Sequence, residues 1–168
     1  MLSKKTRYAM VALTRLAREY GNGAILISEL AKSEMLPQRF LENILLELKK
    51  MGILGSKLGK TGGYFLLRHP KDVNLAEIVR QFEGPIALLS CVSEKAYQSC
   101  EFCKDETACN IRKVFKEIRD TTFEKLESAT LESLIRRNGD LPVNPEQSVK
   151  TDMTQRVDEN ETSVMDRS

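Results

Sequence analysis

The sequence predicts a mainly α-helical chain that carries one small β-hairpin, and two observations support this. Apolar residues recur at steps of three and four through most of residues 6–48 and 110–135, which is the spacing of amphipathic helices. Between these regions, two short β-prone runs flank the glycine-rich stretch GSKLGKTGG. This order of elements is typical of a winged helix-turn-helix, here followed by a long C-terminal helix suited to dimerisation.

Three helices are expected before the hairpin. The first follows apolar positions from Thr6 to Tyr20 and ends at the turn Gly21-Asn22-Gly23. Ser28 is placed to cap a short second helix, and Pro37 suits the first turn of a third. Gly52 is expected to end the third helix in a left-handed conformation. A tight turn therefore joins the second helix to the third.

The remaining elements divide the chain into four parts. The hairpin is expected to have its strands at Ile53-Leu54 and at residues 64–67. Asn74 and Glu77 form a capping box that begins a further helix, which Gly84-Pro85 ends. The expected parts are a winged helix-turn-helix domain over 1–84, a cysteine-rich loop over 85–109, a dimerisation helix with a short helix over 110–135, and a disordered tail over 136–168.

Composition favours one packed unit in the cytoplasm. The 168 residues are 41% hydrophobic and 30% charged, which is an ordinary globular mixture. Charged residues interrupt the apolar positions of the N-terminus, so it lacks the continuous apolar core of a secretion signal. No stretch approaches the roughly 20 apolar residues that a membrane-spanning helix needs. In the cytoplasm thiols stay reduced, so a structural disulfide framework is not expected.

The charge of the chain is distributed unevenly. Residues 1–71 carry 13 Lys and Arg against 5 Asp and Glu, whereas residues 72–135 carry 8 against 12. A basic N-terminal part suits a polyanionic partner such as DNA. A solvated basic face without a partner is equally compatible with the charge alone.

The winged helix-turn-helix prediction assigns roles to several polar side chains. Residues near the start of the third helix would contact base edges in the major groove, and basic residues of the hairpin and first helix would neutralise phosphates. The candidates for base contacts are Gln38, Arg39 and Glu42, and those for phosphate contacts are Lys57, Lys60, Lys4, Lys5 and Arg7. Their case depends on their joint placement rather than on any one residue.

The four cysteines all lie in residues 91–109. One Cys-x-x-Cys half-site, Cys100 to Cys103, is present, whereas a structural zinc site usually pairs two. The distances along the chain to Cys91 and Cys109 match neither common ferredoxin pattern, although clustered thiolates suit an iron-sulfur cluster. Spacing therefore leaves zinc, an iron-sulfur cluster and unligated thiols all open.

Enzyme activity has little support in the sequence. A catalytic cysteine would need a basic partner, and the single histidine, His69, lies outside the cysteine segment beside Pro70. The string GKT at residues 59–61 lacks the earlier glycine of a phosphate-binding loop, because Leu54 occupies that position. We therefore expect a binding protein rather than an enzyme.

The chain resembles a bacterial family of winged-helix transcription regulators, that of IscR, NsrR, RirA and CymR. The resemblance covers about residues 1–135 and depends on TRYAMVALTRLA, on ISELAKSEMLPQRFLENILLELKKMGILGSKLGKTGGYFLL, and on the cysteine loop and long helix that follow. It implies a homodimer that binds inverted-repeat promoter DNA. It further implies that loop cysteines hold a 2Fe-2S or 4Fe-4S cluster whose state tunes DNA affinity.

Position by position, the resemblance assigns a ligand set. Cys91, Cys103 and Cys109 match the three cysteines of the family, and Cys100 is additional. Glu42 matches the recognition-helix glutamate of the family, which agrees with its expected base-reading role.

The usual fourth ligand is missing. Arg112 occupies the position of a ligating histidine in IscR-like members, and Arg7 occupies that of an acidic ligand in the nitric-oxide sensors. The resemblance therefore points to Cys100 as a substitute, with Glu101, Asp105 or a small thiol molecule as alternatives.

The leading functional hypothesis is a repressor or activator switched by a cluster that senses iron, redox state, nitric oxide or cluster supply. The competing hypothesis is a cluster-free regulator of the same fold, controlled by a partner protein or by thiol oxidation. The two differ in whether Cys91, Cys100, Cys103 and Cys109 bind metal.

Overall fold

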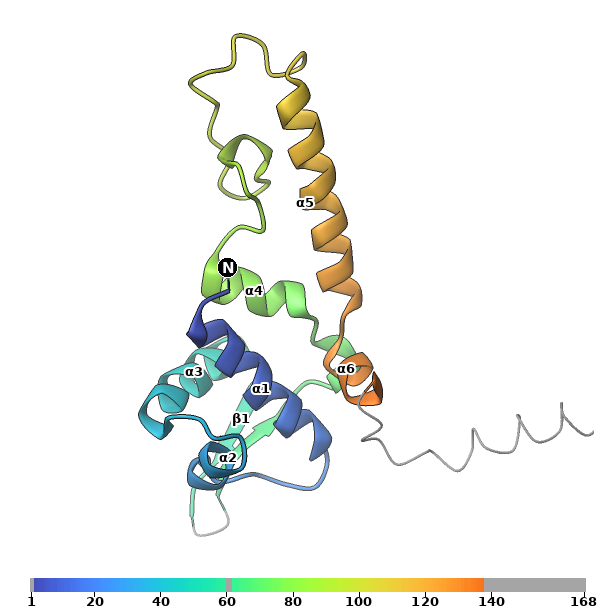
Figure 1. Cartoon of the computed structure of the whole chain (residues 1–168). Coiled ribbons are helices and arrows are strands. Elements are labelled where there is room, and N and C mark those ends of the chain that lie inside the picture. Colours follow the sequence, from blue (N-terminus) through green and yellow to red (C-terminus); the bar gives the residue numbers. More distant parts are fainter. Residues whose placement is uncertain (1, 60–61, 138–168) are drawn as a thin grey trace, which may run out of the picture.

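A computed structural model describes residues 2–59 and 62–137 of the chain (Figure 1). Helices α1 to α3 and the hairpin form a base, from which α5 extends as a stalk, and the segment after α4 runs alongside that stalk. The elements in order are α1 (Lys4–Arg18), α2 (Ile27–Ser33), α3 (Gln38–Lys50), β1 (Leu54–Lys57), β2 (Gly63–Leu66), the 3-10 turn η1 (Pro70–Asp72), α4 (Leu75–Glu83), the 3-10 turn η2 (Ser90–Val92), α5 (Asn110–Ser128) and α6 (Leu131–Arg137).

The base has a core of aliphatic side chains. Helix α3 buries one face completely, and α1 contributes Leu13 and Leu16 to the same cluster. Burying one such side chain stabilises a fold by about 1.5–3 kcal/mol. The core-facing residues of α3 are Leu41, Ile44, Leu45 and Leu48.

Helix α6 also belongs to the base. Leu131 and Ile135 of α6 are fully buried in the core of the base. The segment before α6 is tied to the start of α4 by backbone hydrogen bonds, from Leu75 N to Ala129 O and from Leu131 N to Val73 O, each 2.9 Å long. The stalk is therefore clamped to the base at its C-terminal end.

The turn between α2 and α3 contains a residue in the left-handed conformation. Met35 has φ +52°, and the next amide, that of Leu36, donates to the carbonyl of Ala31 over 2.8 Å. Gly52 has φ +70° at the end of α3, where the amide of Ile53 donates to the carbonyl of Leu48. The two helices thus end in the same way, once with methionine and once with glycine.

The hairpin receives a third short partner from the segment before α2. Ile25 and Tyr64 exchange two backbone hydrogen bonds of 2.9 Å. Gly63, beside Tyr64, has φ +140°, and a Cβ there would lie 2.1 Å from the carbonyl oxygen of Ile25. The second glycine of the GGY motif is therefore required by this close approach of two backbones.

The predicted fold class is confirmed, with corrections at element boundaries. Strand β1 runs on to Lys57, through residues that the sequence assigned to the hairpin tip, because Ser56 and Lys57 pair with Tyr64 and Gly63. Helix α6 includes Arg136 and Arg137, and the rest of the expected tail, residues 138–168, lies outside the described residues. Among the described residues, no helix is both long and apolar enough to cross a membrane.

Replacing Met35 by glycine is expected to stabilise the chain by about 0.5–1 kcal/mol. Glycine adopts positive φ without a side-chain penalty, and the Met35 side chain is 90% exposed and adds little packing. In urea unfolding, the midpoint should rise with an unchanged slope.

The matched control is Gly52→Ala, which places a side chain in the same conformation with open space around it. It should lower the midpoint. A lower midpoint for Met35→Gly as well would contradict the assignment of strain to this turn.

Candidate nucleic-acid interface and thiol segment

The outward face of α3 carries the residues expected to contact DNA bases. Gln38, Arg39 and Glu42 are all exposed, since the buried residues of α3 lie on its other side. Asn43 is exposed next to Glu42, and the sequence reading missed it. Asparagine can pair with adenine through two hydrogen bonds. The sequence could have identified Asn43, because the spacing of Leu41 and Ile44 places those two residues on the buried face of the helix and Asn43 on the other face.

A shallow groove runs along the same helix. Phe40, Asn43, Leu46 and Lys50 line it at steps of three and four residues, and Phe40 is 59% exposed. Apolar side chains at such positions can contact thymine methyl groups. The face of α3 thus combines acceptors, donors and apolar surface.

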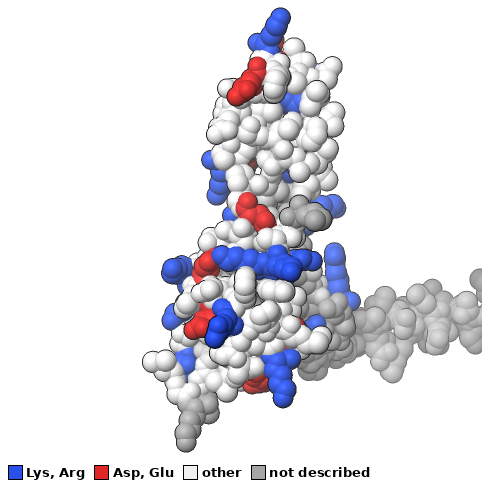
Figure 2. Space-filling view, turned by 60° about the vertical axis from the view of Figure 1, so that its left-hand side comes forward, with Lys and Arg blue, Asp and Glu red and all other residues white. Residues whose placement is uncertain are grey.

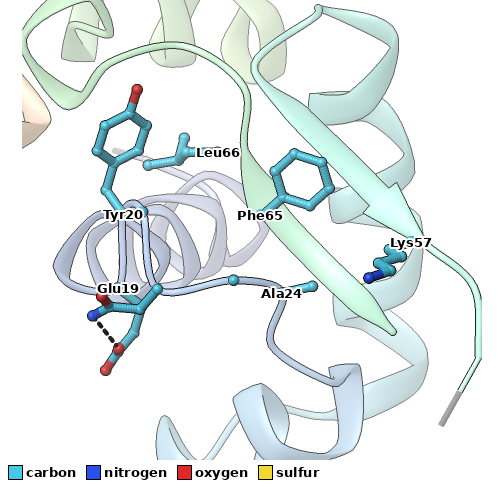
Figure 3. Close-up of a pocket in the computed structure, with 9 residues that line it drawn as sticks. Glu19, Tyr20, Ala24, Lys57, Phe65 and Leu66 are labelled. Carbon is cyan, nitrogen blue, oxygen red and sulfur yellow. Dashed lines mark hydrogen bonds between the residues drawn. The ribbon is translucent and has the colours of Figure 1, made fainter. Parts of the chain in front are cut away.

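Lys57 lies at the end of β1, where the strand meets the hairpin tip. Figure 3 shows it at the edge of a pocket of about 660 Å³ between the turn after α1 and the hairpin. The turn is held by Glu19, whose carboxylate accepts hydrogen bonds from Arg15 and Asn22, and these bonds lower its pKa. Lys57 is exposed, while Lys60 lies outside the described residues.

The basic residues of α1 are placed differently from one another. Lys4 and Arg7 are exposed. Lys5 instead donates to Glu47 of α3 over 2.7 Å and lies 5.3 Å from the centre of the Phe82 ring. Lys5 therefore links three helices. On the face drawn in Figure 2, Lys and Arg side chains gather over the base and are sparser along the stalk.

The cysteine segment lies at the end of the stalk that points away from the hairpin (Figure 1). All four cysteines are in the described part of the chain and carry free thiols. Cys91 is buried in η2, whereas Cys100, Cys103 and Cys109 are partly exposed. Cys109 is the N-cap of α5, and its sulfur accepts a hydrogen bond of 3.4 Å from the amide of Arg112.

Cys103 lies close to two other cysteines of the segment. The thiols of Cys109 and Cys100 both raise the pKa of Cys103, to about 12, and Cys109 contributes most. The pKa of Cys109 is lowered, first by the amide of Arg112 and then by the Cys103 thiol. Within the described residues, however, no three His, Cys, Asp or Glu side chains form a group that could hold a metal ion.

Arg112 joins the two ends of the cysteine segment. Its backbone amide bonds to Cys109, its Nε donates to the Cys91 carbonyl over 3.2 Å, and the same nitrogen lies 3.6 Å from Glu106 Oε2. Tyr97 donates to Glu106 over 2.6 Å, which raises the pKa of Tyr97. Arg112 therefore stands where the resemblance implied a histidine ligand, and it organises the segment.

The two carboxylates considered as alternative ligands differ. Glu101 is exposed. Asp105 accepts hydrogen bonds from the amide and the hydroxyl of Thr107, at 2.8 and 2.7 Å, and these bonds lower its pKa. Asp105 is thus engaged in its own turn.

The stalk helix has an uncovered apolar stripe. None of the residues from Asn110 to Ser128, all of which the structure describes, is buried. Ile111, Val114 and Ile118 are 65%, 53% and 42% exposed, and they lie at steps of three and four on one side of α5. An uncovered apolar stripe of this kind suits a contact with another protein surface.

Recognition helix, wing and uncovered stalk helix together define a winged-helix DNA-binding protein. The family model of Rrf2, described as "Iron-dependent Transcriptional regulator", matches residues 2–137. The chain belongs to the Rrf2 family. It is therefore a transcription regulator and not an enzyme, as the sequence predicted.

Curated proteins and solved structures agree with this assignment. The chain is 46% identical over 138 residues to a putative HTH-type transcriptional regulator, rrf2-like, of Rhodobacter capsulatus, which covers 80% of this chain and 92% of that protein. It is 32% identical over 130 residues to the HTH-type transcriptional regulator CymR of Bacillus subtilis, covering 77% and 91% of the two chains. The solved structure of that global cysteine regulator superposes with a TM-score of 0.69 at 28% identity, covering 82% of this chain and 97% of that one.

In the reduced, metal-free protein, iodoacetamide should alkylate Cys109 several-fold faster than Cys103 at about pH 7, because the thiolate is the reactive form. Cys109 has a pKa below the ordinary thiol value and Cys103 has one above it, so Cys109 ionises first as the pH rises. Mass spectrometry of the digested protein measures both rates.

Cys103→Ala removes the thiol that donates to Cys109 and should slow alkylation of Cys109. Ser99→Ala, in the same segment, is the matched control and should leave both rates unchanged. Faster reaction at Cys103 than at Cys109 would contradict the geometry of the thiol contacts.

Proposed function

We propose that this chain is a homodimeric transcription regulator whose affinity for inverted-repeat promoter DNA is set by an iron-sulfur cluster in residues 91–109. One observation carries the proposal: Cys103 lies close to Cys100 and to Cys109, and Cys109 caps the helix that has the uncovered apolar stripe. A change at the thiols would thereby act directly on the helix that relates two subunits.

The dimer is supported by α5. Two copies that bury Ile111, Val114 and Ile118 against each other would remove these side chains from water, which favours association. A two-fold dimer presents two copies of α3, and half-sites in such complexes lie about 34 Å apart on the duplex. An inverted repeat matches this symmetry.

In the complex, the residues of α3 would read bases. Gln38, Arg39, Glu42 and the newly identified Asn43 would face the major groove, while Lys57, Lys60, Lys4 and Arg7 would contact phosphates. Lys5 would act mainly through its bond to Glu47, which fixes α1 against the recognition helix.

The chemistry of the cysteine donors suits an iron-sulfur cluster, and their side chains would have to move together to hold one. Soft thiolates favour such clusters, and the lowered pKa of Cys109 favours its thiolate. Cys91, Cys103 and Cys109 would hold the cluster, and the contact between Cys100 and Cys103 supports Cys100 as the fourth ligand. Once bound, the cluster would supply a group sensitive to redox state, iron and nitric oxide. Arg112 would hold the ends of the segment together.

A cluster-free regulator is the second candidate. The same contact between Cys103 and Cys109 favours it, because two adjacent thiols can form a disulfide when an oxidant accepts two electrons. For such a regulator, loss of metal would not change the affinity for DNA. Thiol oxidation or binding of a partner protein would change it.

Anaerobic purification separates the two candidates. The cluster proposal predicts a coloured protein with iron and acid-labile sulfide, and loss of both in Cys91→Ser, Cys103→Ser and Cys109→Ser, because each removes a thiolate ligand. Cys100→Ser should weaken cluster retention if Cys100 is the fourth ligand. Ser99→Ala is the control and should retain the cluster. A colourless protein without iron, even after reconstitution, would overturn the cluster proposal and favour the second candidate.

DNA binding is tested by variants of α3 and the wing. Glu42→Ala and Arg39→Ala should each weaken binding to a selected operator by about 1–3 kcal/mol and relax preference at one base position. Lys57→Ala should weaken binding to all sequences and reduce the salt slope by about 1. Fluorescence anisotropy at several salt concentrations measures both effects.

Lys116→Ala, exposed on α5, is the matched control and should bind like the parent protein. Unchanged specificity in both α3 variants would contradict the assignment of α3 as the reading helix.

A further inference from the structure

A second cavity lies between the base and the stalk. Its volume is about 660 Å³, which is within the range of small-molecule sites. Its walls come from four parts of the fold: Met51 after α3, Arg80 of α4, Lys95 of the loop, and Phe123 and Glu127 of α5. The cavity thus touches the DNA-binding part and the stalk at the same time.

The charged groups of this cavity are only partly neutralised. Glu77, on the wall, is bound by Arg68 over 2.8 and 3.0 Å. Lys95 and Glu127 form no ion pair within the described part of the chain. Arg80 stacks on Phe123, with the guanidinium carbon 4.2 Å from the ring centre, and its ion pair with Glu94 is long, at 3.9 Å. The cavity therefore offers cationic groups and one free carboxylate.

A smaller neighbouring cavity adds a desolvated donor. It shares Arg80, Lys95 and Phe123 with the larger one and is also lined by Arg119. The Arg119 side chain is 10% exposed and pairs with Glu94 and Asp120, but its Nε is buried without a hydrogen-bond partner. A buried donor without a partner costs free energy.

The second copy in a dimer is a poor occupant for this cavity. Successive residues of a helix differ by about 100°, so Val114 and Phe123, nine residues apart, face in nearly opposite directions. The uncovered stripe that includes Val114 therefore lies on the other side of α5 from the cavity.

We propose that this cavity binds a free α-amino acid. Arg80 and Lys95 would receive its carboxylate, Glu127 would receive its ammonium group, and Met51 and Phe123 would contact its side chain. A ligand held in this way spans α4 and α5, so its binding would bias the orientation of the stalk relative to the recognition helix. The cavity includes Lys95 of the cysteine segment but none of the four cysteines, so this inference holds with or without a cluster.

The test is calorimetric titration of the full-length reduced protein with each of the twenty L-amino acids. At least one should bind saturably, and its methyl ester and its des-amino analogue should bind at least 10-fold more weakly. Lys95→Ala and Glu127→Gln should each weaken binding at least 10-fold, whereas Glu124→Gln, exposed on the same helix and outside the cavity, should not. Circular dichroism confirms that the variants are folded.

Two outcomes would overturn the proposal. One is that no amino acid binds even at a concentration of about 10 mM, which corresponds to very weak affinity. The other is equal binding by the parent protein and by the Lys95 and Glu127 variants. Because calorimetry requires neither a cluster nor DNA, both results are independent of the proposed function.

Discussion

The rest of the structure depends on the clamp at residues 129–131. There, the chain leaving the stalk pairs with the backbone that precedes α4, and Leu131 and Ile135 then enter the core of the base. Because α5 has no buried residue in its described length, its direction is set by this clamp together with side-chain contacts such as that of Arg80 with Phe123. The clamp ties α5 to the same core that holds α3. The stalk and α3 are therefore connected through this core and are expected to move together.

This connection is the route by which the proposed thiol chemistry, far from the base, would affect DNA binding. Arg112 binds the Cys91 carbonyl and the Cys109 sulfur at the free end of the stalk, and Arg119 pairs with Glu94 lower down. The loop is therefore attached to α5 at two levels. A rearrangement among the thiols would be transmitted to α5 through charged and polar contacts rather than through an apolar core.

Much of the fold could be predicted from the sequence, because helix periodicity and capping are local signals. The spacing of the apolar residues is sufficient to predict α3; these residues are Leu41, Ile44, Leu45 and Leu48. The bond of Lys5 to Glu47, 42 residues away, and the need for Gly63 beside Ile25 could not be predicted, since they depend on how distant segments meet. The sequence alone identified the four cysteines as a candidate site. The three contacts of Arg112, with Cys109, Cys91 and Glu106, could not be predicted because they depend on tertiary geometry.

The central claim is that the state of the cysteine segment sets DNA affinity through the stalk. It is tested most directly by the anaerobic affinity of the metal-loaded protein for its selected operator, compared with the same preparation after chelation. We predict at least a 10-fold difference, which corresponds to a coupling of about 1.4 kcal/mol. Equal affinities of the two forms, with iron loss verified, would contradict the account.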